Sequence, residues 1–286
     1  MKIVETVAEV REQVKAWRKE GLTVGLVPTM GYLHEGHQSL IAKACAQNDR
    51  VVVSVFVNPT QFGPNEDLES YPRDLEHDAA LCESTGAALI FHPTPEEMYP
   101  KGFCSFVDMD VLTKELCGLS RPIHFRGVCT VVSKLLHIVQ PDKAYFGEKD
   151  AQQLAVIRRM VLDLNMNVEI VGCPIVRESD GLAKSSRNTY LSPAERKAAL
   201  VLSKSIFAGK QLAEAGETDA AKLVQAMTEI IEAEPLAKID YVKVVDLMTM
   251  QQIPKLDRPF LAAIAVYIGK TRLIDNFMMQ AGGTAE

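Results

Sequence analysis

The chain has 286 residues, of which 47% are hydrophobic and 24% are charged, and its formal net charge is −6. These values are typical of a globular protein and exclude a disordered or collagen-like chain. The mild acidic balance argues against dedicated binding to nucleic acid or to an anionic membrane, because both depend on clustered Lys and Arg. A local basic pocket for a small anion is compatible with it.

The N-terminal segment and the cysteines predict the compartment. Residues 1–21 carry charges among their apolar positions, which a secretion signal does not. No apolar run approaches the ~20 residues that span a bilayer. The six cysteines are widely spaced without a Cys-x-x-Cys pair, so we expect reduced, mostly buried thiols. The sequence therefore predicts a cytoplasmic protein.

More than half of the chain alternates between strand-like and helical patterns. Thr6 and Glu9 form a capping-box pattern for a first helix, which Gly21 ends. Short apolar runs then predict strands over 22–27, 50–57, 87–91, 143–146 and 168–171, and helical periodicity predicts helices over 35–48, 73–85, 126–139 and 149–164. This alternation predicts an α/β fold, a Rossmann-like doubly wound parallel sheet with helices on both faces.

The pattern changes near 176–183. Ser192-Pro-Ala-Glu195 combines a cap, an N1 proline and an N3 glutamate, and it predicts a long helix to about residue 215. The elements predicted after it are a helix over 218–233 and strands over 239–245 and 260–268. We therefore expect a large domain, residues 1–178, and a small C-terminal α+β domain, residues 179–286.

The first predicted strand ends in PTMGYLHEGH, and a helix begins near Glu35. His34 and His37 are three residues apart, so both imidazoles lie on one face of the first helical turn. The unsatisfied N–H groups of this turn and the helix dipole favour phosphate, and Gly36 permits close approach. Such a motif at the carboxyl end of a strand is typical of nucleotidylyltransferases and class I aminoacyl-tRNA synthetases. Alternatively, the histidines only cap the helix or bind a structural metal, although no Cys/His cluster accompanies them.

A second cluster, DGLAKSSRN, follows the last strand of the large domain. The two hydroxyls and two cations of Lys184-Ser-Ser-Arg187 can donate to triphosphate oxygens and offset charge on a leaving pyrophosphate. The cluster resembles the Lys-Met-Ser-Lys-Ser loop of the same superfamily. Gly181 is a candidate hinge, so the segment 181–188 is the natural candidate for a mobile lid. Taken alone, such a cluster could equally be an exposed polar turn.

Polar side chains also end two other predicted strands. In SVFVNPTQF, Asn58 and Gln61 point to the same sheet edge, and amides recognise hydroxyl and carboxylate groups without adding charge. In YFGEKDAQQ, Lys149 can offset phosphate charge, and Asp150 can accept from ribose hydroxyls or approach Mg²⁺. Gln153 lies one turn on, on the same helix face. Helix capping by Asp150 with a solvated Lys149 is the alternative.

Six motifs in this order resemble the pantothenate synthetase (pantoate–β-alanine ligase) family of the HIGH-motif nucleotidylyltransferase superfamily. They are PTMGYLHEGH, SVFVNPTQF, YPRDLEHD, FRGV, YFGEKDAQQ and DGLAKSSRN. The resemblance covers residues 25–192, and the C-terminal hundred residues agree with it in length and pattern. It implies a ligase that condenses (R)-pantoate with β-alanine at the expense of ATP. The reaction would pass through a pantoyl-adenylate and release pyrophosphate, then AMP, in the biosynthesis of the coenzyme A precursor pantothenate.

The resemblance also implies roles for individual residues. ATP contacts fall on Met30, Gly31, His34, Gly36, His37, Gly147, Glu148, Lys149, Asp150, Val176, Lys184, Ser185, Ser186 and Arg187. Gln61 and Gln153 would hold the hydroxyl and carboxylate of pantoate, and Asn58 is expected in the same substrate site. The proton-donor assignment of the family falls on His37, Mg²⁺ helps to neutralise the triphosphate, and the family expectation is a homodimer.

The chemistry of the first step fits this division of roles. Attack of a carboxylate on the α-phosphorus brings two anions together, so the site must supply positive charge. The available sources are His34, His37, Lys149 and Arg187. The second step, amine attack on an acyl-adenylate, needs positioning and exclusion of water rather than a protein nucleophile.

Two positions depart from the family pattern. Lys184 stands where many members carry an apolar residue, and it either contacts phosphate or points outward. His77 stands where some members carry an acidic residue associated with metal, so Asp78 is the remaining candidate metal ligand. Just before FRGV, Arg121 and His124 are expected contacts of pantoate.

Three alternatives to this ligase remain. A nucleotidylyltransferase acting on a phosphate ester would have no use for Gln61 and Gln153. A tRNA synthetase is disfavoured because the chain is short and acidic and lacks an evident anticodon-binding module. A nucleotide-binding regulator would be supported by loss of either histidine or of the Ser-Ser-Arg triplet, and none is lost.

Overall fold

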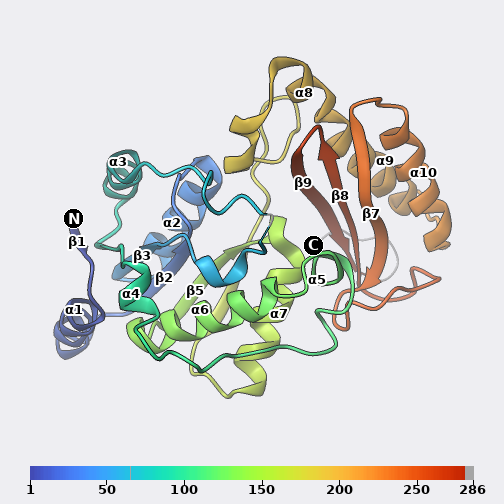
Figure 1. The fold of residues 1–286 in the computed structure, drawn as a ribbon. Helices are drawn as coiled ribbons and strands as arrows, with labels where there is room; N and C mark the ends of the chain where they lie inside the picture. Colours follow the sequence, from blue (N-terminus) through green and yellow to red (C-terminus); the bar gives the residue numbers. More distant parts are fainter. Residues whose placement is uncertain (65, 281–286) are drawn as a thin grey trace. The chain divides into compact units, whose positions relative to one another are not determined.

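The computed structural model describes residues 1–64 and 66–280 (Figure 1), which form two compact units. The first unit comprises Met1–Met109, Arg121–Glu148 and Val156–Pro174, and the second comprises Asp110–Ser120, Lys149–Ala155 and Ile175–Glu286. The division into domains of residues 1–178 and 179–286 stays a prediction. Within the described ranges, no helix combines the length and the apolar character needed to cross a bilayer.

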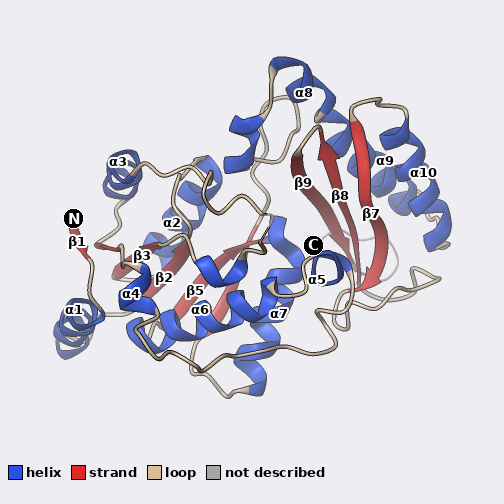
Figure 2. Ribbon diagram, in the orientation of Figure 1, coloured by secondary structure: helices blue, strands red, loops and turns tan. Residues whose placement is uncertain are grey.

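The first unit contains a six-stranded sheet in which all paired strands are parallel (Figure 2). The strand order is β1-β4-β3-β2-β5-β6. The strands are β1 Lys2–Val4, β2 Val24–Thr29, β3 Arg50–Val55, β4 Leu89–Phe91, β5 Lys143–Gly147 and β6 Glu169–Cys173. The predicted α/β fold class is confirmed, and the three-residue strand β1, which pairs with β4, is an addition to it.

Helices connect these strands and cover the sheet. They are α1 Val7–Lys19, α2 Glu35–Gln47, α3 Leu75–Thr85, α4 Pro95–Met98, α6 His124–Val139 and α7 Ala151–Asp163. On one face of the sheet, Ile41 of α2 packs in a buried cluster with Val27 and Val53. Because strand side chains alternate, the equally buried Leu26 and Val52 face the other side. The apolar runs of the sequence are therefore buried on both faces, as expected for a parallel sheet.

Pro28 lies inside β2, although the sequence predicts that it ends the strand. Thr29 O accepts from Phe56 N on the β3 side, so the nitrogen of Pro28 faces the β5 side. Pairing with β5 stops at Leu26↔Ala144, two residues earlier. Proline is accommodated because no strand partner requires an N–H there.

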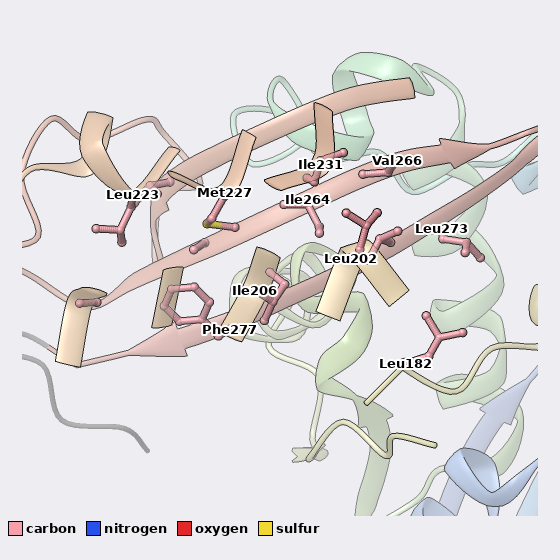
Figure 3. Close-up of a cluster of buried hydrophobic side chains, with 14 of the residues drawn as sticks. Leu182, Leu202, Ile206, Leu223, Met227, Ile231, Ile264, Val266, Leu273 and Phe277 are labelled. Carbon is pink, nitrogen blue, oxygen red and sulfur yellow. The ribbon is translucent and has the colours of Figure 1, made fainter. Parts of the chain in front are cut away.

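The second unit contains a three-stranded antiparallel sheet in the order β7-β8-β9. The strands are β7 Ala237–Asp246, β8 Phe260–Ile268 and β9 Thr271–Met279, and the helices are α5 Leu116–Ser120, α8 Pro193–Ala198, α9 Leu200–Glu214 and α10 Ala220–Glu232. Leu223, Met227 and Ile231 recur every four residues on α10 and share a buried cluster with Ile264 and Val266 of β8 (Figure 3). This packing gives the second unit a hydrophobic core of its own.

Two details of this region differ from the sequence prediction. The helix predicted from Ser192 to about residue 215 is two helices, α8 and α9, which meet at Ala199. The strand β9 was not predicted, because the buried polar residues Asp275 and Asn276 interrupt its apolar pattern. Asp275 accepts from Arg177, and Asn276 Nδ2 donates to Lys149 O, partners that the sequence pattern does not reveal.

Candidate active site

Three motifs of the sequence meet at one edge of the first-unit sheet. HEGH follows β2, NPTQF follows β3 and GEKD follows β5, and β2 lies between β3 and β5. Within the sheet, β3 pairs with one side of β2, and β5, which comes later in the chain, pairs with the other side of β2. The carboxyl ends of β2 and β5 therefore flank the topological switch point, where open α/β sheets bind ligands.

The loop between β2 and α2 is shaped by Asp78. Its carboxylate accepts the Tyr32 N–H at 2.9 Å and the Leu33 N–H at 2.7 Å. Gly31 has φ +85°, and a Cβ there would lie 3.0 Å from Asp78 Oδ2. Burial raises the pKa of Asp78, although both N–H donors act in the opposite direction. The loop thus depends on a buried carboxylate and on a glycine that can adopt a left-handed conformation.

These contacts bear on the predicted metal role of Asp78. Across residues 1–64 and 66–280, no group of three or more His, Cys, Asp or Glu side chains could hold a metal ion. The neighbouring His77 is engaged elsewhere, since its Nε2 lies 3.1 Å from Leu33 O. Asp78 therefore shapes the HEGH loop through these N–H contacts, and its metal role stays a prediction.

The two histidines of HEGH cap α2 through their Nδ1 atoms. Gly36 N donates to His34 Nδ1 at 3.1 Å, and His34 N donates to His37 Nδ1 at 3.2 Å. The ring centroids are 4.1 Å apart. Because Nδ1 accepts in both rings, each neutral imidazole carries its proton on Nε2. Capping and phosphate binding are therefore compatible, since they use different nitrogens of the same ring.

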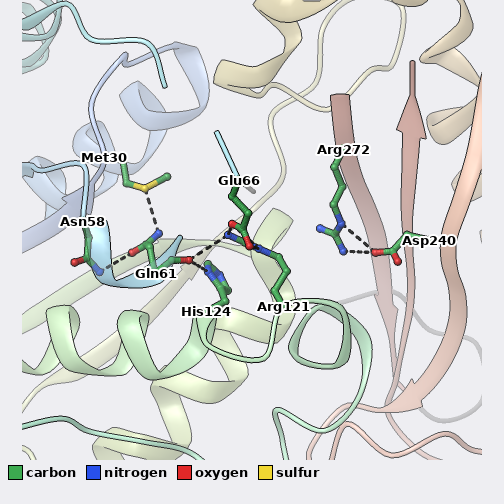
Figure 4. A network of polar contacts seen from close by, with 8 residues as sticks. All are labelled: Met30, Asn58, Gln61, Glu66, Arg121, His124, Asp240 and Arg272. Atoms are coloured by element: carbon green, nitrogen blue, oxygen red, sulfur yellow. Dashed lines mark hydrogen bonds and ion pairs between the residues drawn. The ribbon is translucent and has the colours of Figure 1, made fainter. Parts of the chain in front are cut away.

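Asn58 and Gln61 lie at the end of β3, in the 3₁₀ helix η1 Pro59–Gln61, which Asn58 caps. Asn58 Nδ2 donates to Gln61 Oε1 at 3.0 Å and to Gly127 O at 3.2 Å (Figure 4). A Cβ on Gly127 would lie 2.4 Å from Thr60 O, so η1 can approach α6 only at a glycine. This close packing explains the glycine of the FRGV motif. Asn58 is 1% exposed, and its side chain holds the Gln61 amide in place.

Arg121 and His124 hold the backbone of Gln61. Arg121 Nη2 donates to Gln61 O at 3.3 Å, and His124 Nδ1 lies 3.0 Å from the same oxygen. The guanidinium also forms a bidentate ion pair with Glu66 (Figure 4). Both residues therefore fix the position of Gln61, and their predicted contact with pantoate stays a prediction.

The GEKDAQQ motif is divided between the two units. Gly147 and Glu148 belong to the first unit, whereas Lys149, Asp150 and Gln153 belong to the second. Within the second unit, Lys149 O, two residues before α7, accepts from Asn276 Nδ2 of β9 at 2.8 Å. Lys149 also lines a small pocket of the second unit with Ser185, Asn188, Leu182 and Asp275.

Gln152 is a residue that the sequence analysis did not single out. Its amide accepts from Cys117 N at 2.9 Å and donates to Leu112 O and Glu115 O, both at 2.8 Å. It is 6% exposed. Its only signal in the sequence is its place beside Gln153, because the partners lie far back in the chain and use backbone atoms alone.

The DGLAKSSRN motif closes a short hairpin. Arg177 and Ala183 form an antiparallel bridge, and Lys184 N donates to Val176 O at 2.9 Å. Ser185 then caps the 3₁₀ helix η3 Ser186–Tyr190 by accepting from Arg187 N. The hairpin thus brings Val176 and Lys184 together, two of the positions predicted to contact ATP.

Ion pairs anchor the base of this hairpin. Arg177 donates to both carboxylate oxygens of Asp275, at 2.6 and 2.9 Å, and Asp275 is 1% exposed. Arg196 of α8 contacts Glu178 and Asp180, both at 2.8 Å. The Leu182 N–H and Arg196 hold the pKa of Asp180 below its ordinary value, against the effect of burial. The sequence does not reveal these pairs, because their members are distant in the chain and belong to no motif.

Comparison with known proteins identifies the family. A family model described as pantoate-beta-alanine ligase matches residues 2–278. The chain belongs to this family. It is 68% identical over 277 residues to the pantothenate synthetase of Ruminiclostridium cellulolyticum, covering 97% of this chain and 98% of the relative. The resemblance inferred from the six motifs is confirmed.

Solved structures agree with this assignment. The pantothenate synthetase of Thermus thermophilus is 48% identical with a TM-score of 0.91, covering 97% of this chain and 99% of that one. The pantoate-beta-alanine ligase of Francisella tularensis, complexed with beta-gamma ATP and beta-alanine, is 35% identical with a TM-score of 0.80 and covers 99% and 100% of the two chains. The comparisons therefore confirm that the chain is a ligase of this family with the predicted fold. The roles of the individual site residues stay predictions.

Proposed function

We propose that this chain condenses (R)-pantoate with β-alanine in two steps, at the expense of ATP. The observation that carries the proposal is the HEGH turn, in which two imidazoles cap α2 at the switch point between β2 and β5. Membership of the pantoate-beta-alanine ligase family supports it. The Francisella tularensis relative, complexed with beta-gamma ATP and beta-alanine, supports the choice of nucleotide and amine.

In the first step, a carboxylate oxygen of pantoate attacks the α-phosphorus of ATP. The bond to pyrophosphate breaks, and pantoyl-adenylate forms. His34 and His37 would donate from Nε2 to phosphate oxygens, while the N-terminus of α2 adds the favourable end of its dipole. Donors fixed before the reaction lower the barrier because they need no reorganisation as charge moves to pyrophosphate.

In the second step, the amine of β-alanine attacks the acyl carbon, the amide bond forms and AMP leaves. Gln61 is suited to this site because its amide donates without adding charge, and its backbone is fixed by Arg121 and His124. Acyl-adenylates already carry a good leaving group, so orientation and exclusion of water are the main requirements. No protein nucleophile is needed.

The second-unit residues complete the proposal. We assign Lys149, Ser185, Ser186 and Arg187 to the nucleotide and Gln153 to pantoate, on the family resemblance and on their side-chain chemistry. Mg²⁺ commonly binds through substrate phosphates and water rather than through a protein cage. This fits the described residues, in which no cluster of acidic and histidine side chains could hold a metal. Asp150 is then the carboxylate available to an ATP-bound Mg²⁺.

Pantoate-dependent exchange of pyrophosphate into ATP, with β-alanine absent, tests the proposal. Adenylation without amine should make the exchange depend on pantoate. Exchange that proceeds equally without pantoate, or no exchange in folded protein, would contradict it. A homodimer is also proposed, from the family resemblance alone, and light scattering on the purified protein tests it. A cytoplasmic location is proposed from the charged N-terminal segment and the widely spaced cysteines.

A further inference from the structure

The orientation of the Asn58 amide is fixed by two backbone groups. The Thr60 N–H, which can only donate, lies 3.4 Å from Asn58 Oδ1. The Gly127 carbonyl, which can only accept, lies 3.2 Å from Asn58 Nδ2. An amide turned by 180° would place like groups against each other at both positions. Asn58 therefore presents its NH₂ group to Gln61.

The orientation of Gln61 follows from that of Asn58. Since Asn58 Nδ2 donates at 3.0 Å, the facing atom of Gln61 is the acceptor Oε1. Gln61 Nε2 then points the other way, 3.2 Å from the sulfur of Met30. A thioether is a weak acceptor, so this NH₂ group keeps donor capacity for a ligand oxygen. Met30 follows β2 directly, at the edge where the HEGH loop begins.

Tyr99 and Thr60 strengthen this arrangement through their hydroxyls. The Tyr99 hydroxyl donates to Asn58 Oδ1 at 2.7 Å, the shortest contact of that oxygen, and Thr60 Oγ1 donates to it at 3.0 Å. Burial raises the pKa of Tyr99, so the phenol stays a donor at physiological pH. The Tyr99 ring packs edge-on to Phe103 at 5.0 Å, and the Lys134 ammonium lies 5.7 Å from its centroid.

We propose that Tyr99 is a positioning residue that stabilises the direction of the Gln61 amide. Its hydroxyl holds Asn58, Asn58 holds Gln61 Oε1, and the Gln61 NH₂ group is thereby kept as a donor toward the carboxylate and hydroxyl of pantoate. The inference rests on the proposed function. If the amide turned, Oε1 would face the substrate oxygens, and acceptor would meet acceptor.

The test compares Tyr99→Phe with Tyr145→Phe in the pantoate-dependent exchange assay. Both changes remove a hydrogen-bonded hydroxyl from the first unit, and Tyr145 bonds only Gln47 and Asn48 among the described residues. Tyr99→Phe should raise the KM for pantoate about three- to tenfold and leave the KM for ATP within about twofold, as expected for loss of one hydrogen bond. Tyr145→Phe should change neither KM.

A second series of variants tests, at Thr60, the same chain of hydrogen bonds from Tyr99 and Thr60 through Asn58 to Gln61. Thr60→Val should raise the pantoate KM less than Tyr99→Phe does, the double variant should exceed both, and Thr60→Ser should restore the wild-type value. Equal KM changes for ATP and pantoate, or a Tyr99→Phe value matching that of Tyr145→Phe, would overturn the inference. Failure of the proposed function is distinguishable, because the wild-type protein itself would then show no pantoate-dependent exchange.

Discussion

The two units hold their candidate ligand residues by different means. In the first unit, the side-chain amide of Gln61 is held by neutral amides, hydroxyls and backbone groups around Asn58, whereas the ion-paired Arg121 contacts only the Gln61 backbone. In the second unit, the hairpin that carries Lys184 is anchored by ion pairs, above all Arg177 with Asp275. Neutral hydrogen bonds define which atom faces a substrate, whereas ion pairs fix where a charged loop begins. For the proposed ligand roles of Gln61 and Lys184, the neutral hydrogen bonds would give specificity and the ion pairs would place positive charge.

The two devices should also respond differently to mutation. A buried ion pair that loses one partner leaves an uncompensated charge and is strongly destabilising. A hydrogen-bonded relay that loses one member costs less in folding but can alter the binding of one substrate alone. The following changes probe this difference, beginning with the largest expected effect.

Replacing Asp275 by Ala should lower the free energy of unfolding by about 3–5 kcal/mol, because Arg177 would keep its charge without the carboxylate that neutralises it, although Gly181 O still accepts from it. Urea unfolding of the whole chain measures the change. Asp257→Ala is the matched control, since Asp257 pairs with Arg258 at the surface, where both side chains are more than half exposed. Similar losses of unfolding free energy in the two variants would show that the buried pair stabilises the fold no more than the exposed pair does.

Replacing His37 by Ala should slow pantoate-dependent exchange about 100- to 1,000-fold, the usual effect of removing one fixed donor to a developing charge. Stability should fall by only about 1 kcal/mol, because the change removes one helix-capping contact. His137→Ala is the control, since among the described residues that ring bonds only Ser133 O within α6. A His37→Ala enzyme with a near-normal rate would exclude His37 from the mechanism.

Adjacent glutamines allow a sharper comparison within the second unit. Gln152→Ala should lower the free energy of unfolding by about 1–3 kcal/mol, because Cys117 N, Leu112 O and Glu115 O lose their shared partner. Gln153→Ala should leave stability nearly unchanged but raise the KM for pantoate more than the KM for ATP. Reversed behaviour of the two variants would exchange their assigned roles.

The smallest effect is expected at the rim of the hairpin. Arg196→Met should cost about 1 kcal/mol, because Arg196 is partly exposed and its partners Glu178 and Asp180 are too. The difference from wild type, measured by urea unfolding, should shrink as NaCl is raised, since salt screens exposed pairs. A difference independent of salt would indicate that the aliphatic stem of Arg196 contributes by packing instead.

The sequence predicted the architecture well because local patterns determine it. Alternating apolar runs and helical periods indicated the parallel sheet, and HEGH indicated the start of α2 at Glu35. The strand β9 was not predicted, since the polar residues Asp275 and Asn276 are buried in it, where Asp275 accepts from Arg177 and Asn276 Nδ2 donates to Lys149 O. A polar residue whose partner lies far away in the chain looks, in sequence, like the end of a strand.

The sequence indicated which residue types lie at the candidate site, but not the contacts that their individual atoms make. Asn58 and Gln61 were correctly expected at one sheet edge, but spacing could not tell that both polar atoms of Asn58 serve other residues. Asp78 stood out as a carboxylate, yet its oxygens accept backbone N–H groups. Tyr99 could not be found at all, because an aromatic residue in a loop gives no sign of the oxygen to which its hydroxyl donates.

The contact between Gly127 and η1 has a consequence for how this protein can vary. A Cβ at position 127 would lie 2.6 Å from Gln61 Cα, so even alanine would displace the backbone that carries the amide. Substitution at this position is therefore excluded by geometry alone, although Gly127 contributes only its backbone carbonyl, which accepts from Asn58. A residue with no side chain sets the limit on which sequences can keep the substrate-facing amide in place.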